Sequence, residues 1–351
     1  MKQLVVSHNG HYLTESDGTP FFYLGDTAWE LFHRLTREEA AVYLTKRAEQ
    51  RFTVIQAVAL AELDGLHTPN ANGDLPLIDD DPTKPNEAYF SHVDDIVNTA
   101  EELGLVMGML PTWGDKLPDP LWGVGPVIFN TENARIYGEY LGSRYRDKSI
   151  IWILGGDRPS ETEEKRAIWR AMAEGLRAGD GGNHLISYHP WGVNSSADYV
   201  HQEDWLDFNM VQTSHGYRNH IYAYWQIFAD YLRTPAKPSM DAEPCYEHIP
   251  VGNRTIDDLF DDYDVRQSTY WSLMAGGCGI TYGCNEVWQM WDSGRHPEWL
   301  AHRPWHDVLD LPGANQMQYA RDLYASHPFT KLRPDQALIA HRQGVYEHFA
   351  A

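Results

Sequence analysis

Apolar runs and polar loops alternate along this chain with a regular rhythm. Eight short apolar runs, each followed by a polar loop, predict buried strands at residues 21–26, 54–60, 105–112, 150–155, 185–189, 208–213, 238–242 and 279–283. Stretches with apolar positions every three or four residues predict amphipathic helices over 86–103, 130–146, 161–178, 220–232 and 257–274. Thr36 and Glu39 form a capping-box pattern that predicts one further helix start.

This alternation predicts an α/β fold, a (β/α)8 barrel in which each of eight parallel strands is followed by a helix. A doubly wound open sheet is the structural alternative, but no G-x-G-x-x-G phosphate turn follows the first strand. Asn9-Gly10 lies between two short apolar stretches and predicts an N-terminal β-hairpin under the barrel.

We expect the barrel domain to occupy residues 1–330, with its final helix over 314–325. Residues 331–351 are expected to form a C-terminal tail that opens a further β element, the start of an absent β-sandwich module.

Two of the predicted strands end on a carboxylate. Ile150–Gly155 is followed by Gly156 and Asp157, and Pro238–Ala242 is followed by Glu243. A carboxylate at the mouth of a buried strand is costly to desolvate unless something uses its charge. Because barrel active sites lie at the C-terminal ends of the strands, the fourth and seventh strands would bring both carboxyls to one mouth. The pattern therefore predicts the paired-carboxylate site of a glycoside hydrolase.

Each carboxylate has a functional and a structural interpretation. Asp157 is interpreted as a general acid kept protonated near neutral pH by an apolar surround, and the alternative is a structural pair with Arg158. Glu243 is interpreted as a nucleophile, and the alternative is a helix cap or a buried salt bridge. A carboxyl separation of about 5–5.5 Å would mean retention and about 6.5–9.5 Å inversion, and the sequence leaves both open.

Two other acidic residues lie close to Glu243 in the sequence. Asp241 alternates with Ala242, so we expect Asp241 and Glu243 to point to the same side of the strand, towards the barrel interior or rim. Glu247 is the nearest rival carboxylate and is expected to lie one loop turn further out.

Polar and aromatic residues follow the other predicted strands as well. Together they predict a ring of hydroxyl-binding groups and flat stacking platforms for sugar: Asp26, Trp29, Trp113, His189, Trp191, His215, Asn285, Glu286 and Trp288. A divalent metal held by His189, His215 and the two carboxylates is a rival interpretation. Metal-dependent barrel enzymes usually show an H-x-H pair or a carbamylated lysine at a strand end, and neither pattern occurs here, so no metal site is predicted.

Composition narrows the class of protein further. The formal net charge of -22 would repel a phosphate backbone or an anionic membrane surface, which argues against nucleic-acid and membrane partners. The three cysteines cannot build a disulfide framework and are expected to be reduced. No stretch approaches the ~20 apolar residues of a membrane span. The expected location is cytoplasmic, or periplasmic or secreted if a signal peptide has been removed.

Several of these segments, taken as a set, resemble the apiosidase-like domain, a (β/α)8 glycosidase group typified by glycoside hydrolase family 140. The resemblance spans roughly residues 3–330 and rests on Asn9–Leu13, Asp17–Trp29, Trp152–Asp157, Asp241–Glu247, Thr281–Gly283 and Trp288. It also implies relation to a large clan of barrel glycosidases with catalytic carboxylates on strands four and seven. Most of that clan has Asn-Glu at the end of strand four, where this chain has Gly156-Asp157.

The resemblance implies a retaining glycoside hydrolase with Asp157 as acid/base and Glu243 as nucleophile. The predicted substrate is an oligo- or polysaccharide, an apiose- or other furanose-containing or plant-type glycan, and no metal or organic cofactor is expected. The residues expected to bind substrate are Asp26, Trp29, Trp113, Arg158, His189, His215, Tyr282 and Trp288. The alternatives are a carbohydrate-binding barrel without catalysis and a metal-dependent barrel hydrolase.

Overall fold

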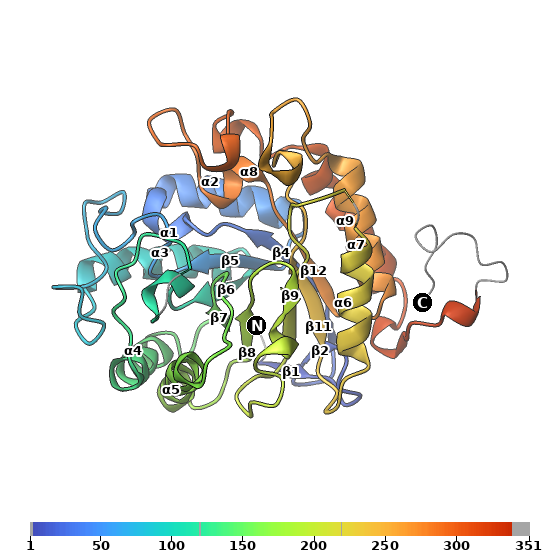
Figure 1. Ribbon diagram of the computed structural model, residues 1–351, viewed down its shortest axis with the longest axis horizontal. Helices are drawn as coiled ribbons and strands as arrows, with labels where there is room; N and C mark the ends of the chain where they lie inside the picture. Colours follow the sequence, from blue (N-terminus) through green and yellow to red (C-terminus); the bar gives the residue numbers. More distant parts are fainter. Residues whose placement is uncertain (1–2, 119–120, 219, 339–351) are drawn as a thin grey trace.

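The centre of the molecule is a barrel of eight parallel strands, shown by a computed structural model that describes residues 3–118, 121–218 and 220–338 (Figure 1). The barrel strands are β4 (Tyr23–Thr27), β5 (Val54–Val58), β6 (Val106–Leu110), β7 (Ile150–Gly155), β8 (Ile186–His189), β10 (Asn209–Gln212), β11 (Ser239–Glu243) and β12 (Gly279–Tyr282). They are arranged in the order β8-β7-β6-β5-β4-β12-β11-β10. All eight predicted strands are confirmed, and the ends move by at most two residues.

Burial on both faces explains why these strands appear in the sequence as continuous apolar runs. All six residues of β7, for example, are buried. The barrel closes between β8 and β10, where the Ser187 hydroxyl donates to the Phe208 carbonyl oxygen at 2.7 Å. Beside that bond, the Asp207 carboxylate accepts the Ile186 backbone N–H at 2.7 Å.

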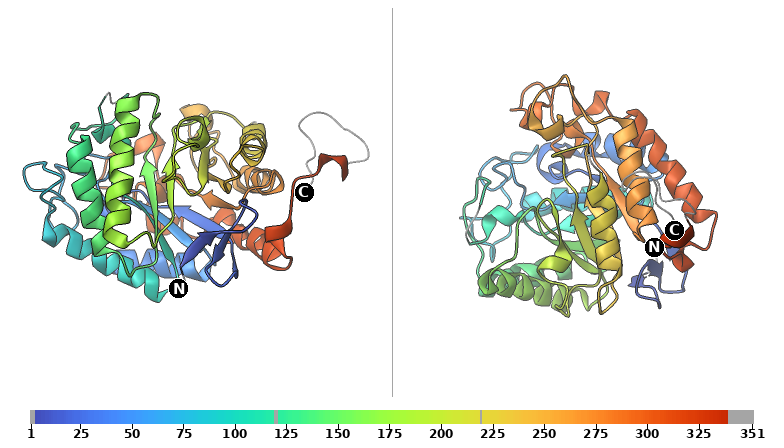
Figure 2. Two further views of the ribbon diagram at one scale, coloured as in Figure 1. Left: turned by 90° about the horizontal axis from the view of Figure 1, so that it is seen from below. Right: turned by 45° about the vertical axis from the view of Figure 1, so that its right-hand side comes forward.

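Helices cover the outside of the barrel in all three views (Figures 1 and 2). They are α1 (Leu31–Arg34), α2 (Arg37–Glu49), α3 (Glu87–Glu102), α4 (Thr131–Arg144), α5 (Glu163–Asp180), α6 (Ile221–Tyr231), α7 (Asp262–Met274), α8 (Asn285–Trp288) and α9 (Pro312–Ala325). The predicted capping box is confirmed, because Thr36 accepts the Glu39 N–H and Glu39 accepts the Thr36 N–H. The chain therefore has the predicted (β/α)8 architecture, with one departure.

The departure is the connection between β8 and β10. It contains the two-residue strand β9 (Asn194–Ser195), antiparallel to β10, and a 3₁₀ turn at Ser196–Asp198. The expectation that every barrel strand is followed by an α-helix is therefore wrong for the fifth strand. The connection, residues 190–208, buries Val200, Trp205 and Leu206 in the core without forming an α-helix, and side-chain hydrogen bonds hold its β9 and 3₁₀ portion.

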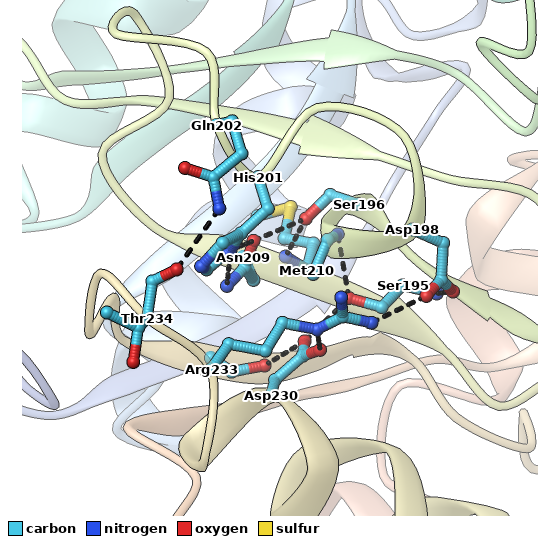
Figure 3. Close-up of polar contacts among 12 residues, drawn as sticks. Ser195, Ser196, Asp198, His201, Gln202, Asn209, Met210, Asp230, Arg233 and Thr234 are labelled. Carbon is cyan, nitrogen blue, oxygen red and sulfur yellow. Dashed lines mark hydrogen bonds and ion pairs between the residues drawn. The ribbon is translucent and has the colours of Figure 1, made fainter.

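Figure 3 shows this polar network. The Ser195 hydroxyl donates to Asp230 at 2.6 Å, and Arg233 pairs with the same carboxylate at 3.1 Å. The Ser196 hydroxyl donates to the Asn209 side-chain oxygen at 3.2 Å, so the 3₁₀ turn is tied directly to β10. These bonds fix the chain that leads into the sixth barrel strand.

A small antiparallel sheet lies under the barrel, where the hairpin was predicted. It consists of β1 (Leu4–Val6), β2 (Leu13–Glu15) and β3 (Pro20–Phe21), and Leu4 lies close to the starts of β6, β7 and β8. Figure 2 shows it beside the segment that follows α9, where the Tyr12 hydroxyl donates to the Leu332 carbonyl oxygen at 3.0 Å. The predicted tail lies mostly at 339–351, outside the described residues, and the domain division stays a prediction.

No helix in the described part of the chain is both long enough and apolar enough to cross a membrane.

Candidate active site

A cavity of about 590 Å³ opens at the C-terminal ends of the barrel strands. It is lined by seven of the residues predicted for the site: Trp29, Trp113, Asp157, Trp191, His215, Glu243 and Trp288. The two strand-end carboxyls, 86 positions apart in the sequence, thus face one space.

Two glycines, Gly155 and Gly156, set the backbone conformation that directs Asp157 into this cavity. Gly155 and Gly156 have φ values of +94° and +92°, a region that side-chain-bearing residues rarely adopt. A Cβ atom at Gly155 would collide with the His189 carbonyl oxygen, and one at Gly156 would lie 2.8 Å from the Gly114 nitrogen. The backbone path of β7 therefore leaves no room for an asparagine at position 156, the residue that most of the related clan carries there.

The Asp157 carboxyl is partly buried and has one strong hydrogen-bond donor. The Trp122 indole N–H donates to its Oδ2 atom at 3.0 Å, and an Arg158 guanidinium nitrogen lies 3.7 Å from the same oxygen. Burial and the negative charge of Glu243 raise the pKa of Asp157 to about 7. A carboxyl with this pKa holds a proton for a substantial share of the time at neutral pH.

Arg158 lies behind Asp157 and does not line the main cavity. Its guanidinium carbon lies 4.2 Å from the Trp122 ring centroid, and Trp122 also stacks on Trp191 at 5.6 Å between ring centroids. The Trp191 indole in turn donates to the Tyr199 hydroxyl at 2.7 Å. Arg158 therefore supports the tryptophan that contacts Asp157.

A bulge in β11 turns Glu243 towards the cavity. In the register with β10, Val211 pairs with Asp241 but Gln212 pairs with Glu243, so Ala242 is an extra residue on β11. The prediction that Asp241 and Glu243 share one side is wrong, because this extra residue breaks the alternation. Asp241 instead accepts hydrogen bonds from Thr213 at 2.7 Å and from Ser272 of α7 at 3.3 Å, outside the barrel.

Three side chains hold the Glu243 carboxylate. Gln212 donates to Oε1 at 2.7 Å, His215 Nε2 lies 3.1 Å from the same oxygen, and His189 Nε2 lies 3.2 Å from Oε2. Burial alone would raise the pKa of Glu243, but the contacts with His189 and His215 outweigh it and hold that pKa well below its usual range. Glu243 is therefore an anion at neutral pH.

The hydrogen bonds of His215 fix its tautomer. The Tyr246 backbone N–H donates to His215 Nδ1 at 3.3 Å, so Nδ1 acts as an acceptor and the ring proton is on Nε2. That proton is donated to Glu243.

His189 is fully buried and is not among the residues that line the cavity. It packs edge-on against Trp29, with 5.3 Å between ring centroids, and Trp29 lies 5.3 Å from Trp113. Trp288 follows β12, the neighbour of β4, and its indole donates to the Asn285 side-chain oxygen at 3.3 Å. The predicted stacking platforms are thus held in fixed orientations.

Two residues predicted to bind substrate lie elsewhere. Asp26 is fully buried against α2, where it bonds Arg47 at 2.6 Å and Tyr43 at 2.5 Å. Tyr282 also faces outward, and its hydroxyl donates to Glu247 at 2.6 Å. Both residues end strands, as predicted, but their side chains leave the outer face of the barrel and do not line the cavity. Glu247, the rival carboxylate, is buried in the same outer cluster.

Several cavity residues were missed as site residues by sequence reasoning: Glu62, Trp122, Gln212, Tyr246, Glu298 and Trp299. Gln212 ends β10 and is the last residue but one of the predicted strand 208–213, so the rule applied to Asp157 and Glu243 could have found it. Glu62 and Trp122 lie in loops, where the sequence carries no periodic signal of side-chain direction.

Among the described residues, no group of three or more His, Cys, Asp or Glu side chains is arranged to hold a metal ion.

An eight-stranded barrel with two carboxyls among histidines and tryptophans at its mouth is the architecture of a barrel glycoside hydrolase. The family model described as the apiosidase-like catalytic domain matches residues 7–331. The chain therefore belongs to the apiosidase-like family and is a glycoside hydrolase, which excludes a carbohydrate-binding barrel without catalysis.

Two solved structures resemble this chain over almost its whole length. A glycoside hydrolase is 35% identical, with a TM-score of 0.88, over 98% of this chain and 79% of that one. A protein described as a glycoside hydrolase family 5 member from Bacteroides vulgatus ATCC 8482 is 33% identical, with a TM-score of 0.89, over 98% of this chain and 76% of that one.

More distant structures show the fold alone. An endo-beta-1,4-mannanase from Thermotoga petrophila is 15% identical, with a TM-score of 0.60, over 91% of this chain and 80% of that one. No curated protein matches this chain.

Proposed function

We propose that this glycoside hydrolase retains anomeric configuration by double displacement, with Asp157 as acid/base and Glu243 as nucleophile. The observation that carries the proposal is that the pKa values of two carboxyls in one cavity are shifted in opposite directions. The pKa of Asp157 is raised to about 7, whereas the pKa of Glu243 is held below its usual range. One group can donate a proton while the other is a ready anion, as the two roles require.

In the first step Glu243 attacks the anomeric carbon and forms an ester bond to it. The bond from that carbon to the leaving oxygen breaks, and the Asp157 proton moves to this oxygen. The donors on Glu243, Gln212 and His215, orient the carboxylate for attack.

In the second step Asp157, now an anion, takes a proton from water. The oxygen of this water attacks the anomeric carbon, the ester breaks, and Glu243 leaves as a carboxylate. While Glu243 is esterified it has no negative charge, so it no longer raises the pKa of Asp157. Asp157 therefore has the higher pKa and keeps its proton when it must donate in the first step. It has the lower pKa and stays an anion when it must accept a proton in the second step.

The substrate we propose is an oligo- or polysaccharide of plant type that contains apiose or another furanose. Membership of the apiosidase-like family supports this class. The absence of a side chain at Gly156 supports it as well, because the cavity lacks the amide that most related barrels place beside the sugar. Trp29, Trp113 and Trp288 offer stacking faces for the ring.

The test is a panel of 4-nitrophenyl glycosides that includes β-D-apiofuranoside, α-L-arabinofuranoside and common pyranosides. We expect turnover of at least one furanoside, and a loss of kcat of about 10³-fold or more in Glu243→Gln and of about 10²-fold or more in Asp157→Asn. Full activity of both variants on a glycoside that the wild type hydrolyses well would overturn the proposed roles.

A further inference from the structure

The cavity contains a third carboxyl for which the two-step reaction has no use. Glu62 follows β5, lines the cavity, and is partly exposed to it. In the described part of the chain no hydrogen bond or ion pair joins its carboxyl to another residue, although in the same cavity Asp157 contacts Trp122 and Arg158, and Glu243 has three partners.

Two buried charged groups fix the backbone on either side of Glu62. The Lys116 ammonium, which is fully buried and paired with Asp115 at 2.8 Å, donates to the Ala61 carbonyl oxygen at 2.9 Å. On the other side the Leu63 N–H donates to the Glu30 carboxylate at 3.2 Å. Burying charged groups is costly, so a segment held by two of them has a closely defined position.

Glu62 follows β5, which is two strands away from β7 and three strands away from β11 in the barrel, so it lies on the Asp157 side of the cavity. Asp157 is the carboxylate whose charge acts on it most strongly, and Arg158 is the one cation among its main electrostatic neighbours. Burial and these neighbouring carboxylates raise the pKa of Glu62 well above its usual range. A carboxyl without a partner beside other carboxylates, here Asp157 and Glu30, is unfavourable in the empty protein. Such a group favours a ligand that brings hydroxyl donors.

We propose that Glu62 is a sugar-recognition residue whose carboxyl binds a pair of neighbouring hydroxyls on one ring of the glycan in this cavity. A carboxyl has two oxygens in a fixed plane, which suits two adjacent hydroxyls of one ring. A site built to bind hydroxyls rejects analogues that lack them, because its polar group is then left unpaired in the bound state. Glu62 thus determines specificity and takes no part in bond cleavage.

This inference rests on the proposed function, and the test separates the two. Kinetics are measured for the wild type, Glu62→Ala, Glu62→Gln and the control Glu139→Gln on the best 4-nitrophenyl glycoside of the panel and on a disaccharide with the same glycone. Glu139 lies on α4, does not line the cavity, and is paired with Arg135 at 3.2 Å. An effect on both substrates assigns the hydroxyls to the glycone, and an effect on the disaccharide alone assigns them to the leaving sugar.

We expect Glu62→Ala to lower kcat/KM by about 10- to 100-fold, mainly through KM, on at least one of the two substrates. Glu62→Gln, which keeps hydrogen-bonding atoms, should lose much less, and Glu139→Gln should stay within about two-fold. Removing one recognised hydroxyl from the substrate should lower kcat/KM of the wild type by a similar factor. The same removal should hardly change kcat/KM of Glu62→Ala, because the variant has already lost the interaction.

Wild-type kinetics for Glu62→Ala on both substrates would overturn the inference. The inference would also be overturned if the loss of kcat/KM caused by Glu62→Ala and the loss caused by the missing hydroxyl were additive in free energy when the two changes are combined. If the wild type cleaves no glycoside, the proposed function fails. Calorimetric titration of wild type and Glu62→Ala with free D-apiose and L-arabinose then still decides whether Glu62 binds sugar. Equal affinities for the two proteins, or no binding by either, would overturn it.

Discussion

The Trp122 indole sets the geometry of the Asp157 proton. An indole N–H can only donate, so Oδ2, which accepts it at 3.0 Å, acts as the acceptor oxygen, and the proton of the neutral acid is on Oδ1. Contacts with Arg158 and Trp191 hold the indole in place. Trp122 is thus a positioning residue for the proposed acid.

This role predicts a specific response to Trp122→Phe, which removes the N–H and keeps an aromatic ring. The hydrogen bond lowers the pKa of Asp157, so its loss raises that pKa. In the wild type kcat/KM falls as the pH rises through about 7, because Asp157 loses its proton, and the variant should move this alkaline limb upward. We expect kcat/KM at neutral pH to drop about 10-fold for poor leaving groups and much less for 2,4-dinitrophenolate.

Trp299→Phe is the matched control, because Trp299 lines the same cavity and has no contact with Asp157 in the described structure. A Trp122→Phe loss that is equal for good and poor leaving groups would contradict the positioning role.

Side-chain direction decides which strand-end residues the sequence could identify. Asp157 and Glu243 stand out because each interrupts an apolar run, and both reach the cavity. Asp26 and Tyr282 stand at strand ends too, but they point outward to Arg47 and Glu247. Inward and outward positions at a strand end differ by one residue of register, which the sequence alone does not fix.

At the scale of elements, β11 and the β8–β10 connection are the two places where regular patterns fail. The alternation rule misplaces Asp241 because the Ala242 bulge changes the parity of β11. Eight strand–helix repeats suggest a helix after β8, yet a polar network replaces it. Both irregularities depend on contacts between distant segments, such as Thr213 with Asp241 and Ser195 with Asp230.

The polar network makes a prediction about stability. Asp230 is 1% exposed and accepts hydrogen bonds from Ser195 at 2.6 Å and from Ser239 at 3.0 Å. Asp230→Ala leaves both hydroxyls without this acceptor, so we expect the free energy of unfolding to fall by about 2–4 kcal/mol, measured by urea denaturation.

The control for this prediction is Asp198→Ala, which removes the other carboxylate on Arg233. Its side chain is 41% exposed, so the loss should be about 1 kcal/mol or less. Equal effects of the two substitutions would show that burial of Asp230 does not govern the stability of this connection.

At the scale of the whole molecule, the barrel was predictable because parallel strands covered by helices must be apolar throughout. The contact between the N-terminal sheet and the segment after α9 was not, since Tyr12 and Leu332 lie 320 positions apart and share no sequence pattern. The fold contributes to function by bringing side chains from distant parts of the sequence into one cavity. Asp157, Glu243 and Glu62 follow three separate strands, and only barrel closure brings them to one cavity.

The central claim is that Glu243 forms a covalent bond with the sugar. The most direct test is incubation with the 2,4-dinitrophenyl 2-deoxy-2-fluoro derivative of the preferred glycoside, followed by protease digestion and mass spectrometry. Fluorine at C2 slows both steps, and the good leaving group restores the first, so the intermediate accumulates. We predict one peptide, the one that contains Glu243, with the mass of a single fluoroglycosyl group. An adduct on another residue, or turnover to a product of inverted configuration without any adduct, would contradict the account.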